Sequence, residues 1–181
     1  MIKNIFSVPI YTSFIDKTMS DKIENLVVPR LSYLEEKGNL RTDYHSKKIV
    51  NPDELNDLFK IINNEVTKYI SETGMRISKN IKFWIQDYLH DHTHYRHTHG
   101  TDFLSGVYYI RANNDPGGIR FHNPNPFPEV YDYDIPKSNV TIYDVDPQKG
   151  MLILFPSWLS HEVLPSENKN CVRTCLAFNY S

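Results

Sequence analysis

The sequence predicts a mainly β protein, a barrel or jelly roll with two N-terminal helices packed on its outside. After Ser78 the chain consists of short apolar runs separated by turn residues, which is typical of β-barrels and sandwiches. Before that point the apolar residues follow helical spacing. The chain has 181 residues, about the size of one domain. We therefore expect one domain, with an arm and supporting helices in residues 1–80 and the β core in residues 81–181.

The first part of the chain predicts a strand and a helix. Residues 5–14 are apolar and β-rich, and a proline interrupts them, which predicts an edge strand or a packed arm. Thr18 and Asp21 form a possible capping box at the start of the first helix. Pro29 is expected to break or restart that helix. Residues 39–50 are polar and predict a loop.

The second helix has clear signals at both ends. Asn51 suits the capping position, Pro52 the first helical position and Glu54 the third. Gly74 is a suitable C-terminal stop. The apolar residues between them recur at helical spacing: Leu55, Leu58, Phe59, Ile62, Val66, Tyr69 and Ile70.

The β core is predicted to contain seven short strands. They cover residues 81–89, 103–111, 119–121, 140–143, 151–155, 159–164 and 172–179. A long insertion at residues 123–139 carries four prolines and the aromatic residues Tyr131 and Tyr133. Such an insertion suits a lid or binding loop, with both tyrosines on the substrate side, or a rigid connector covering a sheet edge.

Composition gives no sign of a nucleic-acid or membrane partner, although a local basic patch stays open. The chain has 20 basic and 22 acidic residues, so no global field attracts nucleic acid or a membrane surface. No apolar run approaches the roughly 18 residues needed to span a bilayer, and the N-terminus is a poor signal peptide. Cys171 and Cys175 would lie about 13 Å apart on one strand, too far for a disulfide. We expect free thiols and a cytoplasmic protein, and the sequence leaves the oligomeric state open.

Histidines cluster just before the second predicted core strand. Five of the eight fall within ten residues: His90, His92, His94, His97 and His99. Residues two apart in a strand share a face, so His97 and His99 would offer two nitrogens to one metal. His161 is the best distant candidate for a third ligand. The coordination positions left open are those that a catalytic metal requires.

The C-terminal segment places His161 and Arg173 on neighbouring apolar runs. Residues 168–170 supply a turn, so a hairpin-like pair of strands would carry an imidazole and a guanidinium into one cavity. That suits a metal ligand beside an anion clamp. The alternative is a histidine bonded to a backbone carbonyl and an arginine in a surface ion pair.

Taken together, these motifs resemble a family of 2-oxoglutarate- and Fe(II)-dependent oxygenases. It is a small family whose uncharacterised members occur in bacteria and marine phages. The resemblance covers roughly residues 81–181. The motifs that carry it are, in chain order, His97-Thr98-His99, Leu104-Ser105-Gly106-Val107-Tyr108-Tyr109-Ile110, Gly117-Gly118, Phe155-Pro156-Ser157-Trp158-Leu159-Ser160-His161, Arg173 and Phe178-Asn179.

The resemblance implies a double-stranded β-helix with iron at one open end. His97 matches the first metal ligand and His161 the distal one, while Arg173 matches the residue that clamps the far carboxylate of 2-oxoglutarate. The wider superfamily usually has Asp or Glu at the position of His99. Asp102, three residues further on, is therefore the alternative second ligand, and His99 is favoured.

Other residues are matched to the cosubstrate and substrate sides. Cys175 replaces a serine of the family near the cosubstrate carboxylate. Either Tyr108 or Tyr109 is expected to donate a hydrogen bond to that carboxylate, and the one facing outward would be a core aromatic. Candidates for the substrate side, each also compatible with ordinary barrel packing, are Trp84, Gln86 and Asn179.

The function implied is that of a dioxygenase using Fe(II), 2-oxoglutarate and dioxygen. It would hydroxylate a small molecule or a peptidyl side chain and release succinate and CO2. Two alternatives stay open: a cupin-type three-histidine metalloenzyme that does not use 2-oxoglutarate, and a non-catalytic metal-binding barrel. Arg173 separates the first two hypotheses, because a cupin needs no guanidinium at that place.

Overall fold

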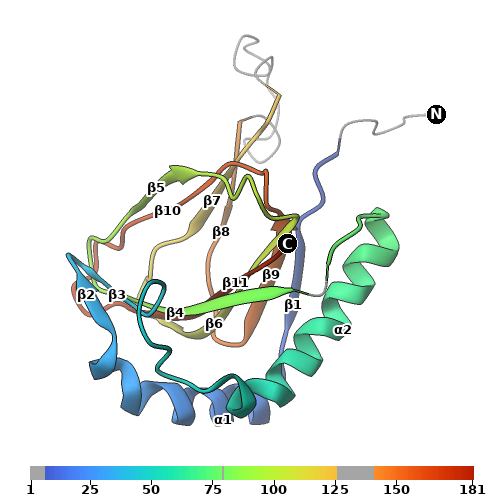
Figure 1. Ribbon diagram of the computed structural model, residues 1–181. Helices are drawn as coiled ribbons and strands as arrows, with labels where there is room; N and C mark the ends of the chain where they lie inside the picture. The colour runs from blue at the N-terminus through green and yellow to red at the C-terminus, as the bar shows by residue number, and fades with distance from the viewer. Residues whose placement is uncertain (1–6, 79, 126–140) are drawn as a thin grey trace.

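A computed structural model describes residues 7–78, 80–125 and 141–181, which form two antiparallel sheets and two main helices (Figure 1). The seven-stranded sheet runs, in spatial order, β1 (Tyr11–Phe14), β9 (Met151–Pro156), β6 (Leu104–Asn113), β11 (Val172–Tyr180), β4 (Ile81–Tyr88), β3 (Leu40–Thr42) and β2 (Glu35–Lys37). The four-stranded sheet runs β5 (His94–His97), β10 (His161–Val163), β7 (Ile119–His122) and β8 (Ile142–Val145).

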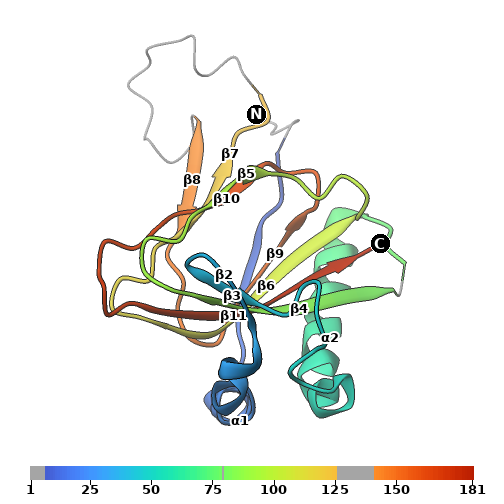
Figure 2. The ribbon, with the colours of Figure 1, turned by 60° about the vertical axis from the view of Figure 1, so that its left-hand side comes forward.

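The helices cover the face of the large sheet that is turned away from the small sheet (Figures 1 and 2). They are α1 (Lys17–Val27), the 3-10 turn η1 (Val28–Tyr33), the 3-10 turn η2 (Pro52–Leu55) and α2 (Asn56–Thr73). The molecule therefore has three layers, with the large sheet in the middle. The mainly β architecture predicted from the sequence is confirmed.

The second helix forms as its sequence signals predict. The Asn51 side chain accepts a bond from the Asp53 N–H, and the Glu54 carboxylate accepts one from the Asn51 N–H, completing a capping box. Gly74 ends the helix in the left-handed region, with φ of 70°, a conformation that glycine adopts without steric penalty.

The start of the first helix differs from the prediction. Its cap is Asp16, whose carboxylate accepts a 3.0 Å hydrogen bond from the Met19 N–H. Asp21, expected in the capping box, instead pairs with Lys17 and Lys149. Pro29 lies in the 3-10 turn that follows the helix, because a proline lacks the N–H that continues an α-helix.

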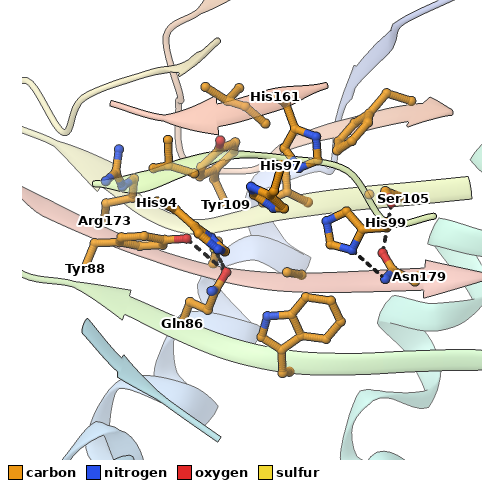
Figure 3. A pocket seen from close by; sticks show the side chains of 18 residues that line it. Gln86, Tyr88, His94, His97, His99, Ser105, Tyr109, His161, Arg173 and Asn179 are labelled. Carbon is orange, nitrogen blue, oxygen red and sulfur yellow. Dashed lines mark hydrogen bonds between the residues drawn. The ribbon is translucent and has the colours of Figure 1, made fainter. Parts of the chain in front are cut away.

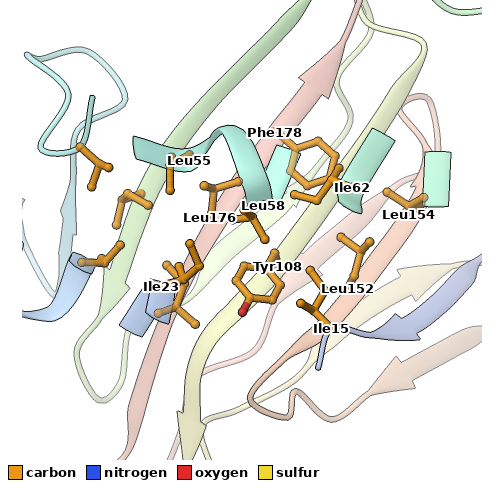
Figure 4. Close-up of a cluster of buried hydrophobic side chains, with 14 of the residues drawn as sticks. Ile15, Ile23, Leu55, Leu58, Ile62, Tyr108, Leu152, Leu154, Leu176 and Phe178 are labelled. Atoms are coloured by element: carbon orange, nitrogen blue, oxygen red, sulfur yellow. The ribbon is translucent and has the colours of Figure 1, made fainter. Parts of the chain in front are cut away.

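Strand alternation gives the large sheet two different faces. The inner face lines a pocket between the sheets (Figure 3), and the outer face packs under the helices (Figure 4). On β6 the Tyr109 ring belongs to the inner cluster and the Tyr108 ring to the outer one. The helices contribute fully buried side chains such as Ile23, Leu58 and Ile62 to the outer cluster.

Short strands account for most differences from the predicted elements. Residues 39–50 were expected to be loop, yet Leu40–Thr42 forms β3, which pairs with β2 and with β4. His94–His97 forms β5, also unpredicted. The expected C-terminal hairpin is wrong: β10 pairs with β5 and β7, whereas β11 pairs with β4 and β6 in the other sheet.

Gly106 marks a close approach within the large sheet. It lies opposite Phe178 and Leu154 on the two neighbouring strands. A Cβ at Gly106 would come within 2.2 Å of the Phe178 ring and 2.9 Å of the Leu154 side chain. Only glycine leaves room there for the buried Phe178 ring.

Two further expectations concern the whole chain. Both cysteines are free, as predicted. Within the described ranges, no helix has the length and apolar character needed to cross a lipid bilayer.

Candidate metal centre

Three histidines converge in the pocket between the two sheets (Figure 3). His97 ends β5 and lies directly opposite His161, the first residue of β10. His99 follows β5 by two residues, and its N–H donates a 2.8 Å hydrogen bond to the Ser157 carbonyl. One nitrogen of each ring lies within 4.8 Å of those of the other two. The cluster therefore has the dimensions of a single-ion site.

Backbone carbonyls fix the tautomers of two of these rings. His97 Nδ1 lies 2.7 Å from the Tyr95 carbonyl oxygen, and His161 Nδ1 lies 2.9 Å from the Leu159 carbonyl oxygen. Because a carbonyl only accepts, Nδ1 carries the proton in both rings. Each Nε2 then keeps a free lone pair, which is the usual arrangement of histidines that bind metals.

Burial keeps two of the rings neutral. Burial, together with the neighbouring His97, lowers the pKa of His161 to about 3 and that of His99 to about 4. A metal ligand must be the neutral imidazole. At neutral pH these two rings are therefore uncharged, and each keeps one nitrogen without a proton.

The reason that His97 and His99 meet is not the one inferred from sequence. The strand ends at His97, so the two rings do not alternate along one strand. Instead, the 2.8 Å hydrogen bond from the His99 N–H to the Ser157 carbonyl holds His99 beside the cluster. Asp102 itself is not in the cluster, and its Oδ2 accepts a 2.8 Å hydrogen bond from Asn179 Nδ2.

Arg173 is a buried cation in the same pocket. It is 3% exposed. Its Nη1 donates to the Leu164 carbonyl at 3.0 Å, and its guanidinium carbon lies 4.2 Å from the centre of the Tyr88 ring. Its Nε has no hydrogen-bond partner, and no carboxylate in the described ranges forms an ion pair with it. A buried charge without a counter-ion is costly, so this end of the pocket is suited to an anion.

The pocket contains most of the other candidates from the sequence. Its lining includes Trp84, Gln86, Tyr109, Cys175 and Asn179. Burial raises the pKa of the Cys175 thiol to about 12, so this thiol stays protonated.

Of the remaining candidate tyrosines, the structure describes only Tyr108. Tyr108 points to the helices and donates a 3.1 Å hydrogen bond to Ser20 Oγ, because strand alternation turns it away from the pocket. Of the two candidates on β6, Tyr109 is therefore the one that faces the pocket. Tyr131 and Tyr133 lie outside the described residues.

The sequence assigns no role to three aromatic residues around the pocket. His94 stacks on His97 with ring centres 4.1 Å apart, and Tyr88 lies under the Arg173 guanidinium. Tyr44 is 51% exposed, and its ring packs on that of Trp84 with ring centres 4.8 Å apart. Period-2 alternation from Gln86 would have placed Tyr88 on the pocket face. Nothing in the sequence indicates that Tyr44, which precedes the core by 37 positions, returns to Trp84.

The donor set fits a divalent transition metal beside an oxyanion. Imidazole nitrogens suit iron and similar metals, and two of the three rings already present a free Nε2 toward the cluster. The unpartnered Arg173 lies in the same pocket and suits a carboxylate, which a guanidinium grips with two hydrogen bonds. Metal and anion would thus bind side by side.

Solved structures define the class of this fold. It is similar to a prolyl-4-hydroxylase from Pseudomonas putida, with a TM-score of 0.66 and 15% identity over 96% of this chain and 92% of that one. It is also similar to a prolyl hydroxylase from Trichoplax adhaerens in complex with a hypoxia inducible factor peptide fragment. The TM-score is 0.66, and the identity is 15% over 95% of this chain and 82% of that one. HygX from Streptomyces hygroscopicus, with nickel, 2-oxoglutarate and hygromycin B bound, matches with a TM-score of 0.58. The identity is 8% over 95% of this chain and 83% of that one. The fold is the double-stranded β-helix of 2-oxoglutarate oxygenases.

The sequence itself identifies the family. Residues 82–179, more than half of the chain, match the sequence model of a protein family described as "Putative 2OG-Fe(II) oxygenase". The chain belongs to this family, and it is a 2-oxoglutarate-dependent non-haem iron oxygenase that uses Fe(II), 2-oxoglutarate and dioxygen. A search among curated proteins finds no match.

Proposed function

We propose that this oxygenase hydroxylates a small molecule or a peptidyl side chain, with iron held by His97, His99 and His161 and 2-oxoglutarate held by Arg173. The observation that carries the assignment is the buried guanidinium of Arg173. Its Nε has no hydrogen-bond partner, and it lies in the same pocket as the only three-residue metal-binding group among the described residues.

The metal assignment is supported by donor chemistry. His97 and His161 are joined by the strand pairing of β5 and β10, and both rings are held by backbone carbonyls that leave Nε2 free. His99 is preferred to Asp102 as the second ligand, because His99 belongs to the cluster of close donor atoms and Asp102 does not.

The cosubstrate assignment is supported by the inner face of β11 and β6. Arg173 would bind the far carboxylate of 2-oxoglutarate through its two-pronged guanidinium. Tyr109 faces the pocket from the neighbouring strand, and burial raises the pKa of its phenol, so it stays a hydrogen-bond donor. Cys175, also in the pocket, supplies only a weak donor where a serine would supply a strong one.

When bound, the iron, 2-oxoglutarate and dioxygen supply an oxidant that inserts one oxygen atom into a substrate C–H bond, with release of succinate and CO2. The residues of this chain bind and orient these groups. Arg173 would hold the far carboxylate of the cosubstrate, and His97, His99 and His161 would hold the metal. The apolar walls of the pocket, including Phe155 and Val107, exclude water.

The substrate would approach over Trp84 and Gln86. Trp84 stacks near His99, with ring centres 6.5 Å apart, and its outer edge meets the half-exposed Tyr44 ring. The Gln86 Oε1 accepts a hydrogen bond from the Tyr88 hydroxyl, which leaves its amide N–H groups to face a ligand. Peptide and small-molecule ligands are both found in the similar structures, so we propose these two classes. Asn179, which the sequence also suggests for the substrate side, is hydrogen-bonded to His99 and Asp102, so we propose that it supports the metal ligands instead.

Two further parts of the proposal concern the chain as a whole. We propose that residues 1–80 and 81–181 act as one domain, because α1, α2 and the large sheet share one buried cluster. We also propose a cytoplasmic location, which the two free thiols support.

The test is anaerobic calorimetric titration of Fe(II), and then of 2-oxoglutarate, followed by a screen of metabolites and peptides for succinate release. We expect saturable cosubstrate binding only after metal loading. Metal binding without any 2-oxoglutarate binding would overturn the assignment of Arg173 and favour a three-histidine site of the cupin type.

A further inference from the structure

His99 differs from the other two histidines in what its Nδ1 faces. His97 and His161 each face a backbone carbonyl, which only accepts. His99 Nδ1 faces the side-chain nitrogen of Asn179 at 2.9 Å, and an amide nitrogen only donates. The proton on His99 is therefore controlled by a side chain that has two possible orientations.

Asn179 is the centre of a buried polar network at the end of the pocket opposite Arg173 (Figure 3). It is 5% exposed. Its Nδ2 donates to Asp102 Oδ2 at 2.8 Å, and its Oδ1 accepts from Ser105 Oγ at 3.0 Å. Ser105 Oγ also lies 2.8 Å from Ser157 Oγ. Every polar atom of the amide has a partner, so the network is satisfied.

This orientation is incompatible with metal binding by His99. An Nδ1 that accepts from Asn179 carries no proton, so the neutral ring carries its proton on Nε2. A protonated nitrogen has no lone pair for a metal. The Nδ1 lone pair is itself directed at the Asn179 amide, so neither nitrogen of His99 is available.

Turning the Asn179 amide by half a rotation resolves the conflict. Its Oδ1 then accepts the Nδ1–H of His99, which frees Nε2, as the carbonyls do for His97 and His161. Its Nδ2 donates to Ser105 Oγ, and Ser105 directs its own hydrogen to Ser157 Oγ. One contact becomes unfavourable, because Oδ1 now faces the Asp102 carboxylate, and two acceptors repel.

We propose that Asn179 is a positioning residue whose amide couples metal binding at His99 to the release of Asp102. In the metal-free protein the amide N–H groups hold both His99 and Asp102. In the metal-loaded protein the amide oxygen holds His99, and Asp102 leaves. The Asp102–Asn179 hydrogen bond thus opposes metal binding, although Asp102 is negatively charged. This inference rests on the proposed function, in which His99 is a ligand.

The sign of the Asp102 effect makes the inference testable. In Asp102→Asn the new amide can donate to Asn179 Oδ1, so the metal-binding orientation loses its repulsion. We expect Asp102→Asn to bind Fe(II) about threefold to tenfold more tightly than wild type. Asn179→Ala removes the acceptor for His99 Nδ1–H and should bind about tenfold or more weakly, the usual size of such outer-sphere effects. The control is Asp91→Asn, which removes the same negative charge from an exposed side chain on the neighbouring loop. It should leave the Fe(II) affinity unchanged.

Anaerobic Fe(II) calorimetry gives the affinities, and circular dichroism checks that each variant is folded. The second readout is the 15N spectrum of histidine-labelled protein with and without Zn(II), which identifies the protonated nitrogen of each ring. We expect His99 to carry its proton on Nε2 without metal and on Nδ1 with Zn(II), while His161 stays protonated on Nδ1 throughout.

The possible failures are distinguishable. If His99→Ala leaves Fe(II) affinity unchanged and Asp102→Asn weakens it tenfold or more, Asp102 is the ligand and the proposed metal assignment fails with the inference. If His99→Ala weakens binding but Asp102→Asn does not strengthen it, or if His99 already carries its proton on Nδ1 without metal, only the coupling through Asn179 is wrong.

Discussion

Replacing Arg173 by lysine tests the cosubstrate site with the charge preserved. Arg173 lies on the inner face of β11, held by the Leu164 carbonyl and the Tyr88 ring, so its guanidinium has a fixed direction. Lysine keeps one positive charge but presents it as a single ammonium group, without the planar fork that matches a carboxylate. One charge-assisted hydrogen bond to 2-oxoglutarate is therefore lost.

The size of the effect follows from that one bond. A hydrogen bond to a charged group contributes about 1.5–3 kcal/mol, and each 1.4 kcal/mol changes affinity about tenfold. Arg173→Lys should thus weaken 2-oxoglutarate binding roughly tenfold to a hundredfold. Arg173→Ala should weaken it more, since the charge is lost as well. Iron binding should be nearly unchanged, because Arg173 is not among the clustered donors.

The assay is calorimetric titration of 2-oxoglutarate into anaerobic protein loaded with Fe(II) or Mn(II). Arg120→Lys is the matched control, because Arg120 forms its two-pronged pair with Asp144, on the small sheet. Equal cosubstrate affinity in wild type and both Arg173 variants would refute the assignment. A loss of metal binding in the same variants would show that the pocket had collapsed instead.

Three further predictions follow. Tyr109→Phe should weaken 2-oxoglutarate binding about threefold to tenfold through one lost hydrogen bond, measured in the same titration; an unchanged affinity would exclude Tyr109 from the cosubstrate site. Gly106→Ala should lower the free energy of unfolding by about 1–3 kcal/mol through overpacking, measured by urea denaturation, whereas Gly100→Ala, which has open space around its Cβ, should change little. The Arg30 side chain and the Asn51 N–H lower the pKa of Glu54 to about 2. Its stabilising contribution is complete above its ordinary pKa of 4.5 and is lost as the pH falls toward 2. The advantage in Tm of wild type over Glu54→Gln should therefore shrink between about pH 6 and pH 3, and a constant difference would contradict the assignment.

Local signals in the sequence predict the elements whose causes are local. The helix after Asn51 has its cap, its proline and its final glycine within its own residues, and the structure reproduces all three. Strands β2, β3 and β5 are short and polar, and partner strands elsewhere in the chain determine them. A pattern within a few residues does not record such pairing.

The residues of the site also fall into those that local sequence signals predict and those that depend on distant partners. His97, His161 and Arg173 stand out by residue type beside apolar strands, and the structure brings all three into one pocket. The polar network of Asn179, Ser105 and Asp102 joins positions as much as 77 apart in the chain, and no spacing rule predicts it. The orientation of one amide, which determines whether His99 can bind a metal, is a property of that network alone.

The two faces of the large sheet have different consequences for how this chain can change. The outer face, with α1 and α2, holds a large apolar cluster that does not line the pocket, whereas the inner face holds the ligand-binding side chains. Since neighbouring residues on β4, β6 and β11 alternate between the faces, a substitution at Trp84 or Gln86 leaves the helix-covered cluster intact. New substrate preferences can therefore evolve on one side of a strand while folding stability resides on the other. This separation is consistent with the same fold occurring in one protein with a bound peptide fragment and in another with bound hygromycin B, which are 15% and 8% identical to this chain.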